Sequence, residues 1–466
     1  MIAFVFPDGP DEFEYDVRGL LTSFFPGSEP VKLPEIPDAE SALDYEFIYR
    51  VPNFPGLKDK TERKNAVKRA VYRELSGLTG KTLPWGTLTG IRPTKLVMKQ
   101  LEEGASEDAI RRFMREMYLI SEEKLGLALQ IAENERKILS GIHFRDGYSL
   151  YAGIPFCPSR CLYCSFTSYP LEKFADRTDP YLETLFEELT ATAAIFKDRP
   201  LDTVYIGGGT PTALTAEQLD RLLARIGSLF DLGRLQEFTV EAGRPDSITR
   251  EKLRVMKNHP VSRISVNPQS MNEETLSLIG RRHSTAQLEE AFRLAREEGF
   301  DNINMDIILG LPGEGPREVE ETIRRIRLLE PDSLTVHALA VKRASRLKME
   351  AAGAVIPGPG QTDTEEMMHI AAEGAAAMGM EPYYLYRQKN MAGNLENVGY
   401  ARPGKAGIYN ILIMEEKQSI AACGAGTVSK AVWPDGRIER ADDVKDLKEY
   451  TERIDEMIER KKHLWA

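Results

Sequence analysis

The sequence predicts an α/β protein built around a partial, three-quarter βα barrel, with an α+β N-terminal domain before it and a mixed C-terminal region after it. Two observations predict this fold. Between residues 149 and 340, six short β-rich segments alternate with helical segments, which is typical of right-handed βαβ units in a parallel sheet. Six units are too few to close an eight-stranded barrel. The regular alternation of β-rich and helical segments is absent on both sides of this region, so we expect domains over residues 1–145, 146–340 and 341–466.

The first domain is expected to contain two strands and three helices. Its strands are predicted at 2–6 and 46–51, and its helices at 58–75, 106–119 and 122–139. Seven basic residues fall between positions 58 and 73, among apolar residues at helical spacing. The solvated face of an amphipathic helix explains this pattern, and an RNA-binding face is the alternative. Glycines and prolines over 77–95 indicate a loop.

The barrel region has the most regular pattern. Its β-rich segments are 149–154, 202–206, 237–241, 263–267, 302–309 and 333–339, and its helical segments include 179–196, 216–230, 285–298 and 317–329. In such folds the chemistry lies at the rim formed by the carboxyl ends of the strands.

The C-terminal region is less regular, and we expect it to cover the substrate. A helix is predicted over 363–378 and a charged helix over 444–463. Between them lie a polar and aromatic stretch, 383–397, and a glycine-rich stretch, 399–426.

Composition indicates a globular protein with a real core. Hydrophobic residues make up 42% of the chain and charged residues 29%, and the net charge of −11 argues against a general affinity for nucleic acid. No apolar run reaches the roughly 18 residues that a membrane-spanning helix needs. The first residues lack the basic start of a signal peptide, and four cysteines are too few for a disulfide scaffold. We therefore expect a cytoplasmic protein that does not enter a membrane.

Three cysteines, Cys157, Cys161 and Cys164, fall within eight residues directly after the first barrel strand. Three thiolates from one loop suit a [4Fe–4S] cluster that keeps one iron open, because soft thiolates favour iron–sulfur clusters. A structural zinc site is the alternative, but zinc usually takes four ligands, and no histidine lies close by in the sequence. The distant Cys423 is expected to be a small buried thiol.

Further candidates follow the later strands. The second strand ends in the run Gly207-Gly208-Gly209-Thr210-Pro211-Thr212. Such a run can be a simple turn, but missing side chains also let a ligand approach the backbone. Glu241, Gln269 and Asp306 each follow a β-rich segment. Carboxylates and amides suit a ligand that carries an ammonium group and ribose hydroxyls.

The C-x3-C-x2-C spacing resembles that of the radical S-adenosylmethionine (SAM) superfamily, which implies a barrel of the radical SAM type. There the open iron chelates SAM, and an electron from the cluster breaks a C–S bond to give a 5′-deoxyadenosyl radical. The segments 151–164, 207–212 and 310–313 resemble the oxygen-independent coproporphyrinogen III oxidase family. With 83–95 and 383–430 included, the chain is most similar to the coproporphyrinogen dehydrogenase-like (HemZ-type) branch of that family.

The resemblance implies a role for individual residues. Cys157, Cys161 and Cys164 would ligate the cluster. The matching positions for the SAM that is cleaved are Tyr151, Gly208 and Glu241. The matching positions for a second SAM are Tyr163, Gly209, Thr210, Gln269, Arg281 and Asp306, with Tyr163 standing where the oxidase has a phenylalanine. The protein would thus bind one SAM or two.

The family reaction abstracts hydrogen from a propionate side chain and releases carbon dioxide, which makes vinyl groups in heme biosynthesis. The implied partners are a tetrapyrrole substrate and a reducing electron donor of the flavodoxin or ferredoxin type. Because coproporphyrinogen carries four propionates, we expect arginines near the rim to bind them. The candidates are Arg343, Arg346 and Arg387, for which an ordinary surface location is the alternative.

One departure keeps other functions open. The oxidase has a further cysteine two residues after the third ligand, where this chain has Ser165-Phe166, a pattern closer to the related heme chaperones. The glycine-rich run at 424–426 also resembles that wider group. A heme chaperone, an RNA-modifying radical enzyme and a porphyrin methylase are therefore the alternatives to an oxidoreductase.

Overall fold

The computed structural model describes the chain except residues 8–11, 27, 39–40, 91, 340–360 and 388–394. It contains two compact units. The first comprises Met1–Asn134, Gly360–Glu365 and Leu385–Asn397, and the second comprises Glu135–Pro359, Glu366–Tyr384 and Val398–Ala466. The division expected at 145 and 340 stays a prediction, because the compact units follow spatial packing and each takes segments from separate parts of the chain.

The first unit contains a three-stranded parallel sheet in the order β2-β1-β3, formed by β1 (Ile2–Val5), β2 (Val31–Lys32) and β3 (Phe47–Arg50). Its helices include α1 (Glu14–Phe24), α2 (Lys60–Thr79), α3 (Thr94–Glu102) and α4 (Glu107–Tyr118), and α5 (Glu122–Ile138) begins in it. Buried side chains of α1 and α2 pack on the sheet in one hydrophobic core. The helices α1 and α3 were not predicted, although buried Val17, Leu20, Leu21 and Phe24 give α1 a helical period.

The basic segment forms the predicted helix α2, and acidic residues of the same unit neutralise part of its charge. Arg63 pairs with Glu12 at 2.6 Å, and the buried Lys68 pairs with Asp16 at 3.3 Å. These contacts favour the structural explanation of the basic pattern over an RNA-binding face.

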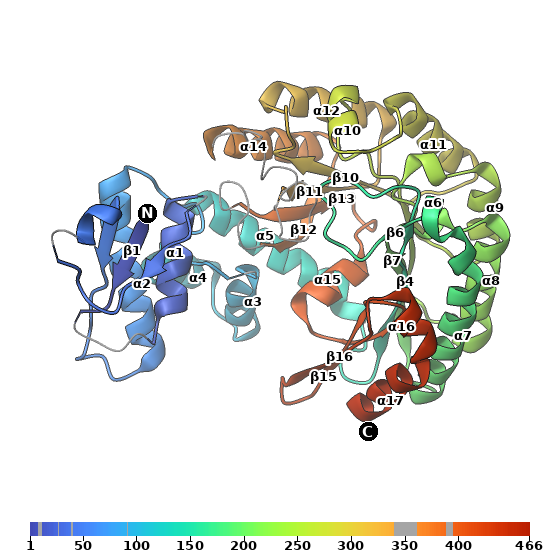
Figure 1. The fold of residues 1–466 in the computed structure, drawn as a ribbon, viewed down its shortest axis with the longest axis horizontal. Helices are drawn as coiled ribbons and strands as arrows, with labels where there is room; N and C mark the ends of the chain where they lie inside the picture. Colours follow the sequence, from blue (N-terminus) through green and yellow to red (C-terminus); the bar gives the residue numbers. More distant parts are fainter. Residues whose placement is uncertain (8–11, 27, 39–40, 91, 340–360, 388–394) are drawn as a thin grey trace. The chain divides into compact units, whose positions relative to one another are not determined.

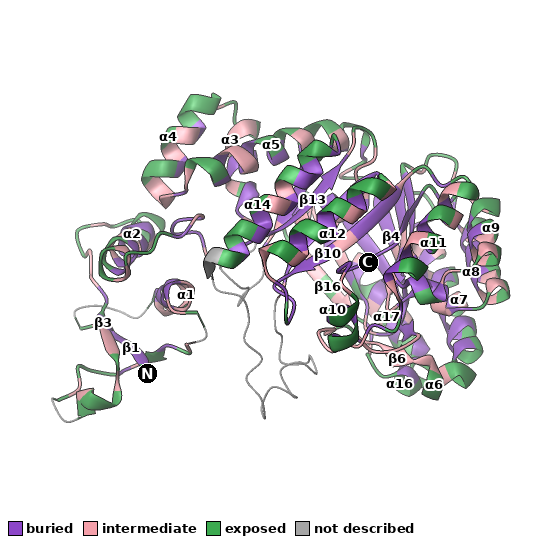
Figure 2. Ribbon diagram, turned by 90° about the horizontal axis from the view of Figure 1, so that it is seen from above, coloured by how far each residue is buried: buried purple, intermediate pink, exposed green. Residues whose placement is uncertain are grey.

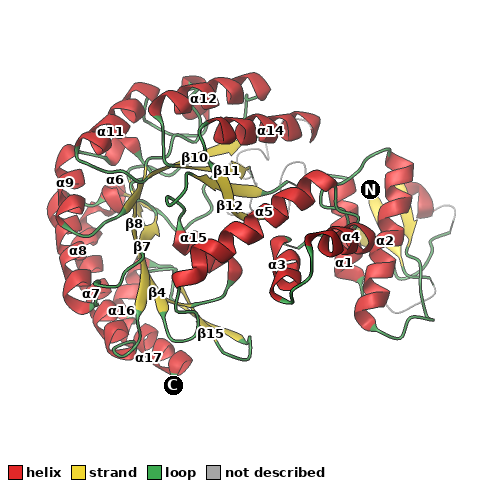
Figure 3. Ribbon diagram, turned by 180° about the vertical axis from the view of Figure 1, so that it is seen from behind, coloured by secondary structure: helices red, strands yellow, loops and turns green. Residues whose placement is uncertain are grey.

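The second unit contains the predicted partial barrel. Six parallel strands lie side by side in the order β11-β10-β9-β8-β7-β4, and helices follow their outer side (Figure 1; Figure 3). The strands are β4 (Tyr148–Ile154), β7 (Leu201–Gly208), β8 (Glu237–Glu241), β9 (Arg263–Ser265), β10 (Ile303–Leu309) and β11 (Ser333–Ala338). The outer helices include α7 (Thr178–Ile195), α8 (Ala216–Leu229), α9 (Arg250–Asn258), α11 (Thr285–Glu297) and α12 (Pro316–Leu329). The predicted fold class is confirmed, and the strands are mostly buried (Figure 2).

The C-terminal region extends this sheet at both edges. Strand β14 (Ser419–Cys423) pairs in parallel with β4 and is followed by antiparallel β15 (Val428–Val432) and β16 (Ile438–Asp442). At the other edge β13 (Asn397–Ala401) pairs antiparallel with β11, next to β12 (Glu381–Tyr386). The sequence predicted none of these strands.

The helices of this region agree in part with the prediction. The helix α14 (Gln361–Ala377) was predicted, whereas α15 (Ile408–Glu415) lies in the stretch read as glycine-rich. The single helix predicted over 444–463 is wrong, because α16 (Leu447–Glu452) and α17 (Ile454–Trp465) are separated at Arg453, whose backbone leaves the helical region. In the described part of the chain, every helix is too short or too polar to span a lipid bilayer.

Candidate functional site

The three clustered cysteines lie in the loop that leaves β4. Cys157 ends the short strand β5 (Phe156–Cys157), and it is buried, as is Cys161, while Cys164 is partly exposed. Backbone hydrogen bonds hold this loop against its surroundings. Gly209 N donates to Ile154 O at 2.8 Å, and Thr210 N donates to Phe156 O at 2.7 Å. Leu162 N donates to Ile279 O at 3.0 Å. The loop is therefore held by the glycine run on one side and by the segment after α10 (Glu273–Leu278) on the other.

The donor set fits an iron–sulfur cluster better than a single metal ion. In the described part of the chain, no three His, Cys, Asp or Glu side chains converge closely enough to hold one ion. Each iron of a four-iron cluster takes a single thiolate, so the thiols of such a site need not converge on one point. Burial raises the pKa of the Cys157 thiol to about 11, so ligation by iron would displace its proton.

The glycine run needs glycine at two positions. Gly208 has a φ of +111°, which is unfavourable for residues with a side chain. A Cβ atom on Gly209 would lie 2.6 Å from the carbonyl oxygen of Phe156 and 3.0 Å from the sulfur of Cys157. The run thus allows the backbone after β7 to pass directly against the cysteine loop.

Glu241 ends β8 beside a stack of aromatic rings. The hydroxyl of Tyr205 donates to Glu241 Oε1 at 2.5 Å, and the ring of Tyr205 stacks on that of Tyr409 with centroids 4.5 Å apart. Tyr151 stacks on both rings with centroids 6.0 Å apart. Burial raises the pKa of Glu241 to about 7, with the bond from Tyr205 opposing the shift and Asp306 adding to it. This carboxyl group therefore changes charge near neutral pH.

Asp306 is oriented by two amide side chains. Asn267 Nδ2 donates to Asp306 Oδ2, and Asn304 Nδ2 donates to Asp306 Oδ1, both at 2.7 Å. The backbone N–H of Gln269 donates to the carbonyl of Asp306 at 2.9 Å. These bonds bring the residues that follow β9 and those of β10 to one place.

Gln269 has two features of a ligand-binding residue. Its φ is +64°, a conformation that costs energy for a residue other than glycine and that is often found at functional sites. Its buried Oε1 accepts no hydrogen bond from the described residues. An unpartnered buried oxygen beside Asp306 is what a bound donor group would satisfy.

Tyr163 belongs to the cysteine loop, and its side chain is hydrogen-bonded to that of Arg281. Tyr163 packs against the apolar side chains of Leu276, Ile279, Ile308 and Leu311. Arg281 is buried, and its Nη1 donates to the backbone carbonyls of Asn267 at 2.7 Å and Gly243 at 3.2 Å. Arg281 thus ties the ends of β8 and β9 together beside the phenol ring.

The structure brings the predicted cluster and SAM residues together in the second unit, at the carboxyl ends of β4 and β7–β10. The roles assigned to them stay predictions. Arg343 and Arg346 lie outside the described residues. Arg387 lies in the first unit, buried, with its Nη1 donating to Leu88 O and its guanidinium 5.9 Å from the Trp85 ring centre.

Sequence reasoning missed four residues of this site. Arg244 and Asn267 follow β8 and β9, where the same rule that selected Glu241 could have found them. Tyr205 lies inside β7, where an aromatic residue is ordinary. Tyr409 comes from α15, which nothing in the sequence connects with the barrel.

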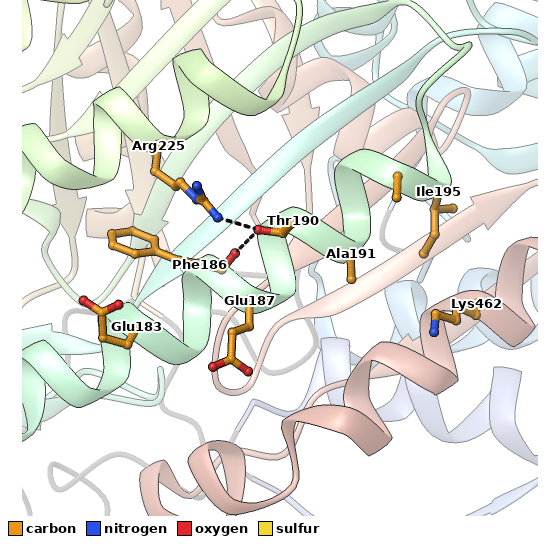
Figure 4. A pocket seen from close by; sticks show the side chains of 9 residues that line it. Glu183, Phe186, Glu187, Thr190, Ala191, Ile195, Arg225 and Lys462 are labelled. Atoms are coloured by element: carbon orange, nitrogen blue, oxygen red, sulfur yellow. Dashed lines mark hydrogen bonds between the residues drawn. The ribbon is translucent and has the colours of Figure 1, made fainter.

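A groove on the outer side of α7 is unrelated to this site (Figure 4). It is lined by residues of α7 with Arg225 and Lys462, and none of the predicted site residues lines it. Arg225 donates to Thr190 there at 2.9 Å.

Comparisons with known proteins agree with the predicted family. The model of the radical SAM superfamily matches residues 151–326. A curated relative, the oxygen-independent coproporphyrinogen-III oxidase-like protein HemZ of Bacillus subtilis, is 42% identical over 403 residues, which covers 85% of this chain and 80% of the relative. The chain belongs to this HemZ-type family of radical SAM proteins. Its membership implies a [4Fe–4S] cluster and SAM as cofactors.

Two further similarities are to a heme chaperone and to a solved structure of an oxidase. The heme chaperone HemW of Bacillus subtilis is 34% identical over 236 residues, covering 50% of this chain and 62% of HemW. The solved structure of coproporphyrinogen III oxidase (HemN) from Escherichia coli, described as a radical SAM enzyme, matches with a TM-score of 0.55 at 22% identity, covering 70% of this chain and 73% of that one. The second match supports the fold.

Proposed function

We propose that this protein is a radical SAM oxidoreductase that converts propionate side chains of coproporphyrinogen III into vinyl groups without oxygen. The observation that carries this proposal is the grouping of three thiols with Glu241, Gln269 and Asp306 at one barrel rim, in a chain 42% identical to an oxidase-like relative. Removal of a hydrogen atom and loss of carbon dioxide leave one electron, which must pass to an acceptor.

The residues of the rim divide this work. Cys157, Cys161 and Cys164 would hold the cluster, and the cluster with SAM supplies the carbon radical that removes hydrogen. Tyr151, Gly208 and Glu241 would hold the SAM that is cleaved. A second SAM would contact the remaining rim residues, which are Tyr163, Gly209, Thr210, Gln269, Arg281 and Asp306. The buried, unpartnered Oε1 of Gln269 supports a ligand on that side of the pocket.

The substrate and the electron donor are proposed from the chemistry that each must have. We expect Arg343 and Arg346 to bind propionates, because bidentate arginine is the best carboxylate partner. For Arg387 the contacts with Leu88 and Trp85 support a structural part in the first unit as well. A flavodoxin- or ferredoxin-type reductant in the cytoplasm would supply the electron.

A heme chaperone is the second candidate. Ser165 and Phe166 stand where the oxidase has its further cysteine, and the Phe166 side chain is 68% exposed beside the cluster loop. The similarity to HemW points the same way. A chaperone would bind heme firmly and pass it on, with no loss of carbon dioxide.

One paired experiment separates the two candidates. Reconstituted protein is incubated without oxygen with SAM, a reductant and coproporphyrinogen III, and the products are analysed by mass spectrometry. The same preparation is titrated with heme and passed through a desalting column. Vinyl products support the oxidoreductase, whereas unchanged coproporphyrinogen together with heme that stays bound through the column supports the chaperone.

A further inference from the structure

Arg244 is a buried cation that directly contacts the cysteine loop. It is 3% exposed and lies three residues after Glu241, in the turn that follows β8. Its Nη1 donates to the sulfur of Cys161 at 3.4 Å and to the carbonyl of Ser159 at 3.1 Å, and its Nη2 donates to Ser159 Oγ at 3.0 Å. One guanidinium thus holds the middle cysteine and the residue two positions before it.

The opposite edge of the guanidinium is anchored by Asp246. Arg244 Nε donates to Asp246 Oδ1 at 2.9 Å, and Nη2 donates to Oδ2 at 2.8 Å. A bidentate pair of this kind fixes the plane of the guanidinium as well as its position. Each of the five N–H groups of Arg244 therefore has a hydrogen-bond acceptor. No other side chain has enough donors, in this geometry, to bind both Asp246 and the loop.

The same turn is braced against the glycine run. The hydroxyls of Ser247 and Thr212 are 2.7 Å apart, and Lys252 Nζ donates to the carbonyls of Thr212 at 2.7 Å and Ser247 at 3.0 Å. The end of β8 therefore carries Glu241, and the turn directly after it contacts the cysteine loop through Arg244 and the glycine run through Ser247. Movement of Arg244 relative to the pocket is restricted from both sides.

Charge next to a cluster changes how readily the cluster takes up an electron. The guanidinium stays charged at any pH that proteins tolerate. Asp246 lies on the far edge of the guanidinium, so the charge nearest to Cys161 is positive. A positive charge and an N–H···S hydrogen bond both stabilise the reduced form of a cluster, which carries one more negative charge. The neighbouring Arg281 also acts on Cys161 through its charge. Its Nη1, however, donates to the carbonyls of Asn267 and Gly243, and among the described residues the guanidinium that donates to the Cys161 sulfur is that of Arg244.

We infer that Arg244 is a positioning residue that holds Cys161 in the cysteine loop and raises the reduction potential of the bound cluster. This inference rests on the cluster of the proposed function, and it is independent of the tetrapyrrole.

The test compares the full chain with four variants after anaerobic reconstitution. Arg244→Gln removes the positive charge, and Arg244→Lys keeps the charge but cannot form the bidentate pair. Asp246→Asn removes the negative charge and leaves the guanidinium in place. Arg282→Gln is the matched control, because Arg282 is an exposed arginine on the same rim that pairs with Glu172 at 2.8 Å. Iron per chain is measured first. The reduction potential is then measured without SAM, by electron paramagnetic resonance at a series of fixed potentials.

At a fixed applied potential, Arg244→Gln should lower the ratio of reduced to oxidised cluster about tenfold. This corresponds to a reduction potential about 59 mV lower, for a one-electron couple. Arg244→Lys should recover most of that loss, Asp246→Asn should show no lowering, and Arg282→Gln should match the parent. A parental potential in an iron-loaded Arg244→Gln, or equal lowering in the Gln and Lys variants, overturns the inference. If Arg244→Gln holds no iron, Asp246→Asn decides, since a lowered potential there contradicts a role for the positive charge. Because tetrapyrrole takes no part, a failure here is distinct from a failure of the proposed function.

Discussion

At the scale of single residues, the environment of Glu241 bears on its proposed contact with SAM. Its carboxyl group lies among the rings of Tyr151, Tyr205 and Tyr409, and burial there raises its pKa to about 7. Below that pH the group is neutral, and above it the group is an anion that accepts stronger hydrogen bonds. The proposed contact with the SAM amino group should therefore strengthen as the pH rises.

SAM affinity of the cluster-loaded protein should accordingly increase about tenfold between pH 6 and pH 8, since the charged fraction of Glu241 rises through its pKa in that interval. At pH 8, Glu241→Gln should weaken binding by roughly 1.5–3 kcal/mol, or about ten- to a hundredfold. Anaerobic equilibrium dialysis measures both. The Gln variant also serves as the control for the pH dependence of SAM itself, and parallel pH curves for parent and variant would show that Glu241 does not contact the ligand.

The cysteines give a second prediction at this scale. Cys161→Ala should lose most of the iron and the brown colour, because the loop provides only three thiolates for the cluster. Cys423→Ala is the matched control, since Cys423 is buried in β14 with its sulfur 3.2 Å from the Thr192 hydroxyl. Iron and sulfide analysis of anaerobically purified protein measures the effect. Full iron in Cys161→Ala, or zinc in the parent, would be incompatible with a cluster at this loop.

At the scale of elements, the barrel could be predicted because each of its βα units is coded locally. Apolar segments such as 303–309 alternate with helices that have their own caps, and the residues after each strand meet at one rim. The edges could not be predicted, since β14 pairs with β4 across most of the chain and its residues read as a glycine-rich stretch. Tyr409 was hidden for the same reason, because only tertiary packing brings α15 beside Tyr205.

The short segment directly before β13, Leu395 and Glu396, is held in the first unit by a buried ion pair. Glu396 is fully buried, accepts from Trp85 Nε1 at 2.7 Å and pairs with the buried Lys124 at 2.8 Å. These contacts tie the segment to α5 and to the stretch that the sequence indicated as a loop.

Glu396→Ala should therefore destabilise the first unit by up to about 3–5 kcal/mol, because it removes the buried partner of Lys124 and leaves that buried charge only the exposed Glu123, at 3.1 Å. Urea denaturation followed by the fluorescence of Trp85, the only tryptophan of that unit, measures the change in the free energy of unfolding. Lys99→Ala is the control: its pair with Glu103, at 3.7 Å, is exposed, so its loss should cost less than about 1 kcal/mol. Equal effects of the two substitutions would contradict this account of the segment.

At the scale of the whole molecule, membership of the family implies the cofactors. Recognition of the proposed substrate should depend on residues outside the cofactor pocket. Replacing Arg343 and Arg346 together with alanine should weaken tetrapyrrole binding at least about tenfold, because each lost charged hydrogen bond costs roughly 1.5–3 kcal/mol, and should leave SAM binding unchanged. Carbon dioxide per SAM cleaved should fall while 5′-deoxyadenosine still forms. Isotope-labelled carboxyl groups and chromatography measure the two yields. Decarboxylation at the parental rate in the double variant would remove these arginines from the substrate site.

In the proposed reaction, the radical removes hydrogen from a propionate side chain of a tetrapyrrole. This step can be followed with coproporphyrinogen III that carries deuterium on the propionate carbon next to the ring, incubated anaerobically with the protein, SAM and a reductant. Mass spectrometry of 5′-deoxyadenosine should show one deuterium gained for each vinyl group formed. Unlabelled 5′-deoxyadenosine together with tetrapyrrole that keeps all its deuterium and all its carboxyl groups would contradict hydrogen removal from a propionate.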